Sequence, residues 1–228
     1  MTLLIFDCDG VLVDSEMIAL DLLAKMLTDL GCPIAVAECR LRFMGKSTSD
    51  VLADVEGMLG RPVPVEFGDG MKALLFERLR RDLQPLRDVR DIISALPYQV
   101  CVASSSQPER IALSLEVTGL APLFEGRVFS AAEVRHGKPA PDLFLHVAAR
   151  LGVKPEEAIV VEDSPAGITA ARRAGMRAIG FAGASHADSA LARMLVSAGA
   201  QDVLTKMVDL PAAIERLRAK SIAAAMHP

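Results

Sequence analysis

Two aspartates separated by one residue, Asp7 and Asp9, follow directly after an apolar run at residues 3–6. A carboxylate can act as a nucleophile, as a general acid or base, or as a ligand for a hard metal ion. By itself, such a pair is more often a turn or a helix cap than a catalytic site. Its chemistry therefore has to be judged together with the polar groups that the rest of the chain brings beside it.

Other polar side chains share this placement directly after an apolar run. They are Ser104, Ser105 and Ser106 after residues 99–103, and Glu162 and Asp163 after residues 158–161. Apolar runs without alternation are typical of strands buried on both faces, as in a parallel sheet. Ligands of such sheets bind at the carboxyl ends of the strands, so we expect these groups to meet in one crevice.

The acidic groups of this crevice need a positive partner, because clustered carboxylates repel one another and raise one another's pKa. Oxygen ligands alone suit Mg²⁺, whereas a zinc site would be expected to contain Cys or His. Lys138, in a proline-stiffened turn at residues 137–142, adds positive charge, and the serine hydroxyls add donors. Together with helix N-termini, these groups can bind a phosphoryl group. The residues alone therefore predict a site for Mg²⁺ and phosphate.

The elements that position these groups are apolar runs of strand length separated by helical patterns. The runs are residues 3–6, 99–103, 158–161 and 177–181. Helical patterns open at Pro108, Pro141 and Pro165. Ser106 and Glu109 have the spacing of a capping box for the first of these helices. Alternating strands and helices predict an α/β fold with a doubly wound, Rossmann-like parallel sheet.

Residues 16–82 interrupt this alternation with helical patterns and no strand signal. The clearest pattern is a set of leucines with helical spacing, namely Leu20, Leu23, Leu27 and Leu30. We therefore expect a small α-helical cap domain at residues 16–82, inserted in an α/β catalytic core made of residues 1–15 and 83–228. Asp14 and Glu16 are expected to cap its first helix and to shape the hinge.

The composition is that of a globular chain, with 228 residues, 51% of them hydrophobic, and a net charge of −4. The negative charge and the scatter of Lys and Arg argue against a nucleic-acid partner. Cysteines without CxxC pairs favour a reduced compartment, and no signal peptide or membrane span is recognised. The histidines lack metal-ligand spacing; they are His136, His146, His186 and His227. We expect a cytoplasmic monomer without a membrane partner.

Four segments resemble, in order, the motifs of the haloacid dehalogenase superfamily of phosphohydrolases. They are DCDGVLVDSE at 7–16, ASSS at 103–106, GKPAPD at 137–142 and VVEDSPAG at 160–167. The similarity is to the branch that includes β-phosphoglucomutase and small sugar phosphatases. It implies that Asp7 is a nucleophile that forms an aspartyl-phosphate, and that Asp9 is the general acid and then the base. True dehalogenases lack the second aspartate, so Asp9 favours phosphate over halide.

The binding groups of the site also follow from the resemblance. It implies that the phosphoryl oxygens are held by Ser104, Ser105 and Lys138. It implies that Mg²⁺ is bound by three carboxylates and one backbone carbonyl, a set made of Asp7, Glu162, Asp163 and the carbonyl of Asp9. The expected partner of this site is a small phosphorylated metabolite.

The segment Gly45-Lys46-Ser47 has the end of a P-loop pattern. The position five residues before Gly45 is Arg40 where a P-loop needs glycine, which argues against nucleotide binding. The resemblance instead places Gly45 and Lys46 in a cap loop that recognises the part of the substrate beyond the phosphate.

The leading prediction is a Mg²⁺-dependent phosphatase for a small phosphorylated metabolite, such as a sugar phosphate. The nearest alternative is a phosphomutase of the β-phosphoglucomutase type. Mutases of that branch carry a histidine twelve positions after the nucleophile, where this chain has Ala19, so hydrolysis is favoured. A remote alternative is a non-catalytic phosphate-binding regulator, which would be expected to have lost Asp7, Asp9 or Lys138.

Overall fold

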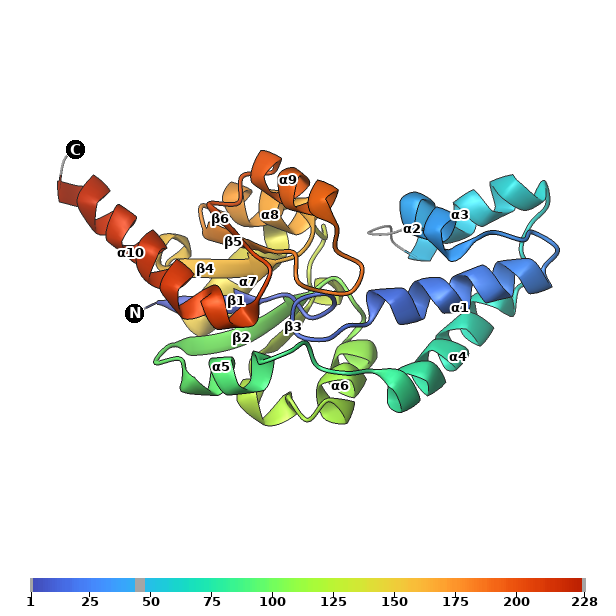
Figure 1. Cartoon of the computed structure of the whole chain (residues 1–228), viewed down its shortest axis with the longest axis horizontal. Coiled ribbons are helices and arrows are strands. Elements are labelled where there is room, and N and C mark those ends of the chain that lie inside the picture. The colour runs from blue at the N-terminus through green and yellow to red at the C-terminus, as the bar shows by residue number, and fades with distance from the viewer. Residues whose placement is uncertain (1, 44–47, 227–228) are drawn as a thin grey trace. The chain divides into compact units, whose positions relative to one another are not determined.

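The protein is described by a computed structural model that covers residues 2–43 and 48–226. The chain divides into two compact units. An α/β unit contains Met1–Asp14 and Gln84–Pro228, and a helical unit contains Ser15–Leu83. Figure 1 shows the elements of both units coloured along the chain.

Six strands of the described chain form one sheet in the α/β unit. They are β1 (Leu3–Phe6), β2 (Gln99–Ser104), β3 (Val128–Ser130), β4 (Ala158–Glu162), β5 (Arg177–Phe181) and β6 (Asp202–Leu204). Their order is β3-β2-β1-β4-β5-β6, and every neighbouring pair is parallel. The order reverses between β1 and β4, which is the kind of place where such sheets bind ligands. This confirms the predicted doubly wound α/β fold.

Strand β1 lacks an alternating pattern because both of its faces are covered. Leu3 and Ile5 lie in a buried cluster with side chains from three helices, α7 (Asp142–Leu151), α8 (Pro165–Arg173) and α9 (Ser189–Ser197). Phe6 points to the other face, where its ring meets Phe124 edge-on with centroids 6.3 Å apart. A buried strand with this packing holds the residues at its carboxyl end in fixed positions.

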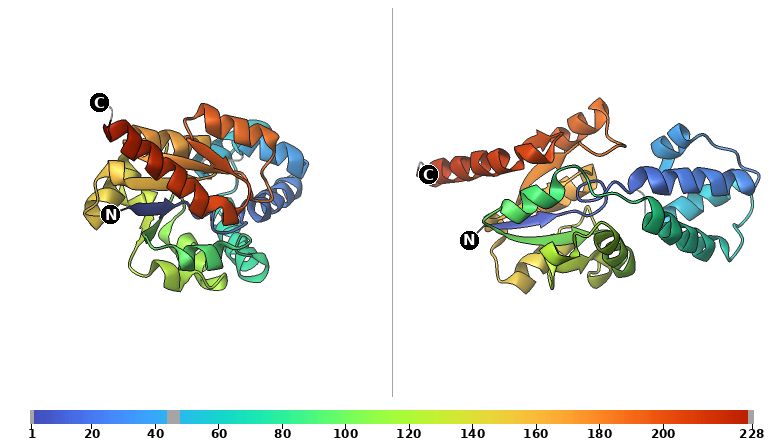
Figure 2. Two further views of the ribbon diagram at one scale, coloured as in Figure 1. Left: turned by 60° about the vertical axis from the view of Figure 1, so that its left-hand side comes forward. Right: turned by 60° about the horizontal axis from the view of Figure 1, so that its bottom comes forward.

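Helices flank both faces of the sheet, as Figures 1 and 2 show. Besides α7, α8 and α9 they include α5 (Val89–Ala95), α6 (Pro108–Val117) and α10 (Leu210–Met226). Helix α6 begins at Pro108 as expected, but its N-cap is Gln107 and has no side-chain cap. The predicted capping box of Ser106 and Glu109 is therefore wrong. The Ser106 hydroxyl is directed to a different acceptor, Asp9.

The helical unit consists of α1 (Glu16–Asp29), α2 (Val36–Phe43), α3 (Thr48–Leu59) and α4 (Phe67–Asp82) in the described chain. Leu20, Leu23 and Leu27 lie in its buried core, which explains their helical spacing. The expected cap of α1 by Asp14 is wrong, since the N-cap is Ser15. The Asp14 carboxylate instead accepts hydrogen bonds within the α/β unit.

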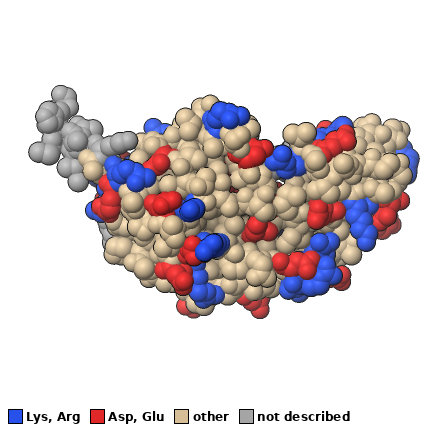
Figure 3. Space-filling model, in the orientation of Figure 1, with Lys and Arg blue, Asp and Glu red and all other residues tan. Residues whose placement is uncertain are grey.

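Charged side chains of both signs are interspersed over the face of the molecule shown in Figure 3. The chain has 25 Lys and Arg against 29 Asp and Glu, so the two signs nearly balance. Among the described helices, none combines the length and the apolar character needed to cross a membrane.

Candidate active site

The carboxyl ends of three neighbouring strands, β1, β2 and β4, lie at the same edge of the sheet. The register of β1 with β2 and with β4 puts Asp7 beside Ala103 and Glu162, one residue past the last paired positions of β1. The backbone N–H of Asp7 donates to the carbonyl of Val161 at 3.0 Å and so extends the ladder to this point. The carboxyl edge of the sheet therefore carries two carboxylates on adjacent strands.

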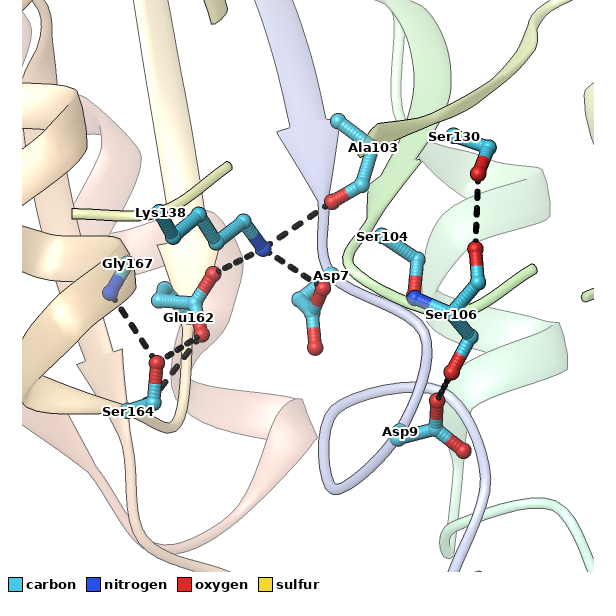
Figure 4. A network of polar contacts seen from close by, with 10 residues as sticks. All are labelled: Asp7, Asp9, Ala103, Ser104, Ser106, Ser130, Lys138, Glu162, Ser164 and Gly167. Carbon is cyan, nitrogen blue, oxygen red and sulfur yellow. Dashed lines mark hydrogen bonds and ion pairs between the residues drawn. The ribbon is translucent and has the colours of Figure 1, made fainter. Parts of the chain in front are cut away.

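The ammonium group of Lys138 joins these strand ends, as Figure 4 shows. Its Nζ donates to Asp7 Oδ1 at 2.7 Å, to Glu162 Oε2 at 2.7 Å and to the Ala103 carbonyl at 3.1 Å. Three acceptors match the three N–H bonds of an ammonium. Burial lowers the pKa of Lys138, but Asp7 and Glu162 outweigh it, so that the pKa is raised. Lys138 therefore stays charged within the site.

A group of carboxylates at this edge could hold a metal ion. Asp7, Glu162 and Asp163 each offer an oxygen, and these oxygens lie within 4.8 Å of one another. Burial, followed by the charge of Glu162, raises the pKa of Asp7 well above its usual range although Lys138 lowers it. Three buried carboxylates beside one lysine leave surplus negative charge, and an oxygen-only donor set suits a hard divalent cation. The residues present therefore fit Mg²⁺.

The carboxylate of Glu162 is held on both oxygens. Oε2 accepts from Lys138, and Oε1 accepts from the Ser164 hydroxyl at 2.8 Å and from the Ser164 N–H at 3.2 Å. Ser164 is also the N-cap of α8 and accepts from the N–H of Gly167 at 3.0 Å. A Cβ on Gly167 would lie 2.0 Å from the carboxyl carbon of Glu162. The start of α8 thus fixes the Glu162 carboxylate in the position where it accepts a hydrogen bond from Lys138.

Asp9 is held by a different set of groups, from the β2–α6 connection and from α6. The Ser106 hydroxyl donates to its Oδ2 at 2.6 Å, and Arg110 Nη2 donates to its Oδ1 at 2.8 Å. Asp9 itself lies in a tight loop in which the N–H of Gly10 donates to the carbonyl of Val13 at 2.8 Å. Both carboxylate oxygens therefore act as acceptors, which is the arrangement expected of the ionised form.

Ser106 is fixed in its turn by two buried serines. Its N–H donates to Ser104 Oγ at 3.1 Å, and its carbonyl accepts from Ser130 Oγ at 2.7 Å. Ser130 caps the turn after β3, where its N–H donates to Glu133 at 2.7 Å. The ends of β2 and β3 thus position the hydroxyl that reaches Asp9.

The structure brings most of the predicted site residues together. Those at the carboxyl edge of the sheet are Asp7, Asp9, Ser104, Lys138, Glu162 and Asp163. Ser105, predicted to bind phosphate, is exposed at the surface of the α/β unit. Gly45 and Lys46, predicted to recognise the substrate, lie outside the described residues.

Three residues at this edge make contacts that the sequence does not predict. Ser106 is expected in the crevice with the other serines and as a helix cap, but not as a donor to Asp9. Neither Arg110 nor His186 is predicted to lie at this edge. Arg110 is 101 positions from Asp9 along the chain, so no local spacing signals their contact. Its place on the helix that follows the serine run is the signal that could have indicated it. His186 Nε2 lies 3.2 Å from Asp163 Oδ2.

Comparison with known proteins shows to which family this chain belongs. The model for haloacid dehalogenase-like hydrolases matches residues 1–175, a range that contains every group at the carboxyl edge except His186. The chain belongs to the haloacid dehalogenase-like hydrolases. This confirms the resemblance noted in the sequence motifs.

Individual members of the haloacid dehalogenase-like hydrolases are similar over most of this chain. The 6-phosphogluconate phosphatase of Escherichia coli K12 is 28% identical over 182 residues, covering 79% of this chain and 82% of that protein. The phosphorylated carbohydrates phosphatase of Thermotoga maritima is 30% identical over 190 residues, with coverages of 78% and 84%. A crystal structure of a haloacid dehalogenase-like protein of unknown function from Agrobacterium tumefaciens C58 superposes with a TM-score of 0.86, 43% identity and coverages of 96% and 99%.

Proposed function

We propose that this chain is a Mg²⁺-dependent phosphatase that hydrolyses a small phosphorylated metabolite, a sugar phosphate or a related compound, through an aspartyl-phosphate. The broader statement, that it is a phosphoric monoester hydrolase, follows from the family and from relatives that are phosphatases. The observation that carries the finer proposal is Lys138, held between Asp7 and Glu162 with Asp163 alongside.

The nucleophile in this proposal is Asp7. Lys138 holds its Oδ1, while among the described residues no hydrogen bond reaches Oδ2. One oxygen is thereby fixed and the other can attack phosphorus, forming an Asp–O–P bond as the bond from phosphorus to the ester oxygen breaks. Lys138 then lies beside the phosphoryl oxygens and stabilises the charge that develops on them.

Asp9 moves the protons in this proposal. In its protonated form it gives a proton to the departing alcohol. As a carboxylate it then takes a proton from water, whose oxygen bonds to phosphorus as the bond from Asp7 to phosphorus breaks, releasing inorganic phosphate and the free Asp7 carboxylate. Ser104 supports phosphate binding, because a hydroxyl whose Oγ accepts from Ser106 N–H can at the same time donate its own hydrogen to a phosphoryl oxygen.

Mg²⁺ would be held by the carboxylates of Asp7 and Asp163, with the Asp9 carbonyl and Glu162 completing the set. When bound, it would offset the negative charge of the phosphoryl group and of the carboxylates around it. The fit rests on the surplus charge of this cluster and on its oxygen donors.

Phosphate release from a library of phosphorylated sugars, sugar acids and related metabolites in Mg²⁺ tests the proposal. We expect release from a subset of the library, and none above background with Asp7→Asn, which keeps the shape of the nucleophile without its charge. Equal release by wild type and Asp7→Asn would contradict the assignment. Isomerisation of glucose 1-phosphate in the presence of a sugar bisphosphate, without hydrolysis, would favour the phosphomutase alternative.

A further inference from the structure

His186 is buried against one of the acidic residues of the site. It lies in the loop between β5 and α9, is 4% exposed, and places Nε2 at 3.2 Å from Asp163 Oδ2. An ionised carboxylate has only acceptors, so Nε2 is the nitrogen that carries the hydrogen in this contact. The imidazole therefore contacts one of the two carboxylate oxygens of Asp163, Oδ2.

The loop that carries His186 is anchored on both sides of it. Just before it, Ser185 donates to Asp14 Oδ1 from its hydroxyl at 2.8 Å and from its N–H at 3.2 Å. Just after it, Asp188 caps α9 by accepting from the N–H groups of Ala190 and Leu191, both at 2.9 Å. Hydrogen bonds on both sides of His186 therefore hold the segment of backbone that carries it.

The loop after β1 leaves room for this contact. Gly10 has a φ of +77°, a conformation that favours glycine. A Cβ at this position would lie 1.8 Å from Asp163 Oδ2 and 3.0 Å from His186 Cε1. Segments that follow β1, β4 and β5 thus pack together around a single carboxylate oxygen.

We propose that His186 is a positioning residue that holds Asp163 Oδ2, so that Asp163 binds the divalent cation through one oxygen and the site favours Mg²⁺ over Ca²⁺. The inference rests on the proposed function, because only there is Asp163 a metal ligand. Mg²⁺ demands near-ideal octahedral geometry, whereas Ca²⁺ accepts bidentate carboxylates and irregular coordination. A carboxylate restricted to one oxygen therefore suits the smaller ion.

Two amide substitutions test the contact of Nε2 with Asp163 Oδ2. His186→Gln can place an amide N–H where Nε2 lies, whereas His186→Asn has its amide at the position of Nδ1. Isothermal titration of the full-length, substrate-free protein with Mg²⁺ alone and with Ca²⁺ alone measures both affinities. We expect His186→Asn to weaken Mg²⁺ binding about 10- to 100-fold, as is typical for partners of metal ligands, and to weaken Ca²⁺ binding less. His186→Gln should stay close to wild type for both ions.

Each result decides the inference. Equal weakening of Mg²⁺ and Ca²⁺ binding in His186→Asn, or no weakening of either, would overturn it while leaving the proposed phosphatase intact. A wild-type protein that binds neither ion, yet hydrolyses phosphate esters in chelator, would overturn the metal part of the proposed function as well. Thermal unfolding in chelator checks that each variant is folded. If His186→Asn does not fold, His186→Leu, which also lacks the donor, takes its place.

Discussion

Asp7 and Asp9 are two residues apart, yet the carboxyl edge of the sheet holds them by different means. On the Asp7 side, a lysine whose side chain is 4% exposed lies between two carboxylates at the ends of adjacent strands. On the Asp9 side, the cation is Arg110, which is 21% exposed and lies on a helix, and the second partner is a hydroxyl. The first arrangement fixes charge in a buried place. The second holds its carboxylate with a partly exposed cation and a neutral hydroxyl, which suits the proton transfer that we propose for Asp9.

The largest effect that follows from this difference is expected for Asp9→Asn. Without the acid and base we expect steady-state turnover of an alkyl phosphate to fall about 10²- to 10⁴-fold. An aryl phosphate such as p-nitrophenyl phosphate has a leaving group that needs no proton, so Asp7 is still phosphorylated. Stopped-flow measurement should then show a burst of nitrophenolate in Asp9→Asn and no burst in Asp7→Asn.

The matched control for Asp9→Asn is Asp202→Asn, because Asp202 also pairs with an arginine, Arg216, but lies away from the site. It should keep wild-type turnover. A loss of the burst in Asp9→Asn equal to that in Asp7→Asn would remove the distinction between the two aspartates.

Lys138→Met tests the buried side of the comparison. The substitution leaves Asp7 and Glu162 facing each other without a cation, and breaking a buried ion pair in this way costs about 3–5 kcal/mol of unfolding free energy. Removing a single stabilising donor from the transition state is expected to lower kcat about 10²- to 10³-fold as well. Urea unfolding in chelator and steady-state kinetics in Mg²⁺ measure the two effects.

The control for Lys138→Met is Lys206→Met, at an exposed lysine of the same unit, which should change neither quantity. The double variant Lys138→Met with Glu162→Gln should recover part of the lost stability, since one of the two stranded charges is gone. Equal stability of Lys138→Met and wild type would show that the lysine does not hold these strand ends together.

The sequence predicted the strands that are buried on both faces and missed those that are short and exposed. Residues 3–6 and 177–181 coincide with β1 and β5, because a continuous apolar run reports burial on two sides. The strands β3 and β6 have three residues each and keep partly exposed positions at the edges of the sheet. Three residues are too few for a period to appear, so only their pairing in the folded sheet defines them.

The candidate site divides in the same way. Asp7, Glu162 and Asp163 could be predicted to meet, because each lies at or directly after the end of a buried apolar run and parallel strands end at one edge. Arg110 and His186 could not, because a helix or a loop delivers them from a distance and their contacts depend on how those elements pack. Local sequence patterns therefore predict residues at strand ends better than they predict side chains that helices and loops bring to the site.

For Ser106, the spacing rule for helix caps predicts the wrong hydrogen-bond partner. Of the substitutions considered, Ser106→Ala is expected to lower activity and stability the least. The spacing to Glu109 fits a capping box, but Ser104 and Ser130 hold the Ser106 backbone so that its hydroxyl donates to Asp9. Losing this bond should cost about 0.5–1.5 kcal/mol in stability and, because Arg110 still holds the other oxygen, only about tenfold in kcat. Ser106→Thr, which keeps the hydroxyl, should restore most of the activity in the same assay of alkyl phosphate turnover. Identical kcat values for the alanine variant, the threonine variant and wild type would mean that Arg110 alone is enough to position Asp9.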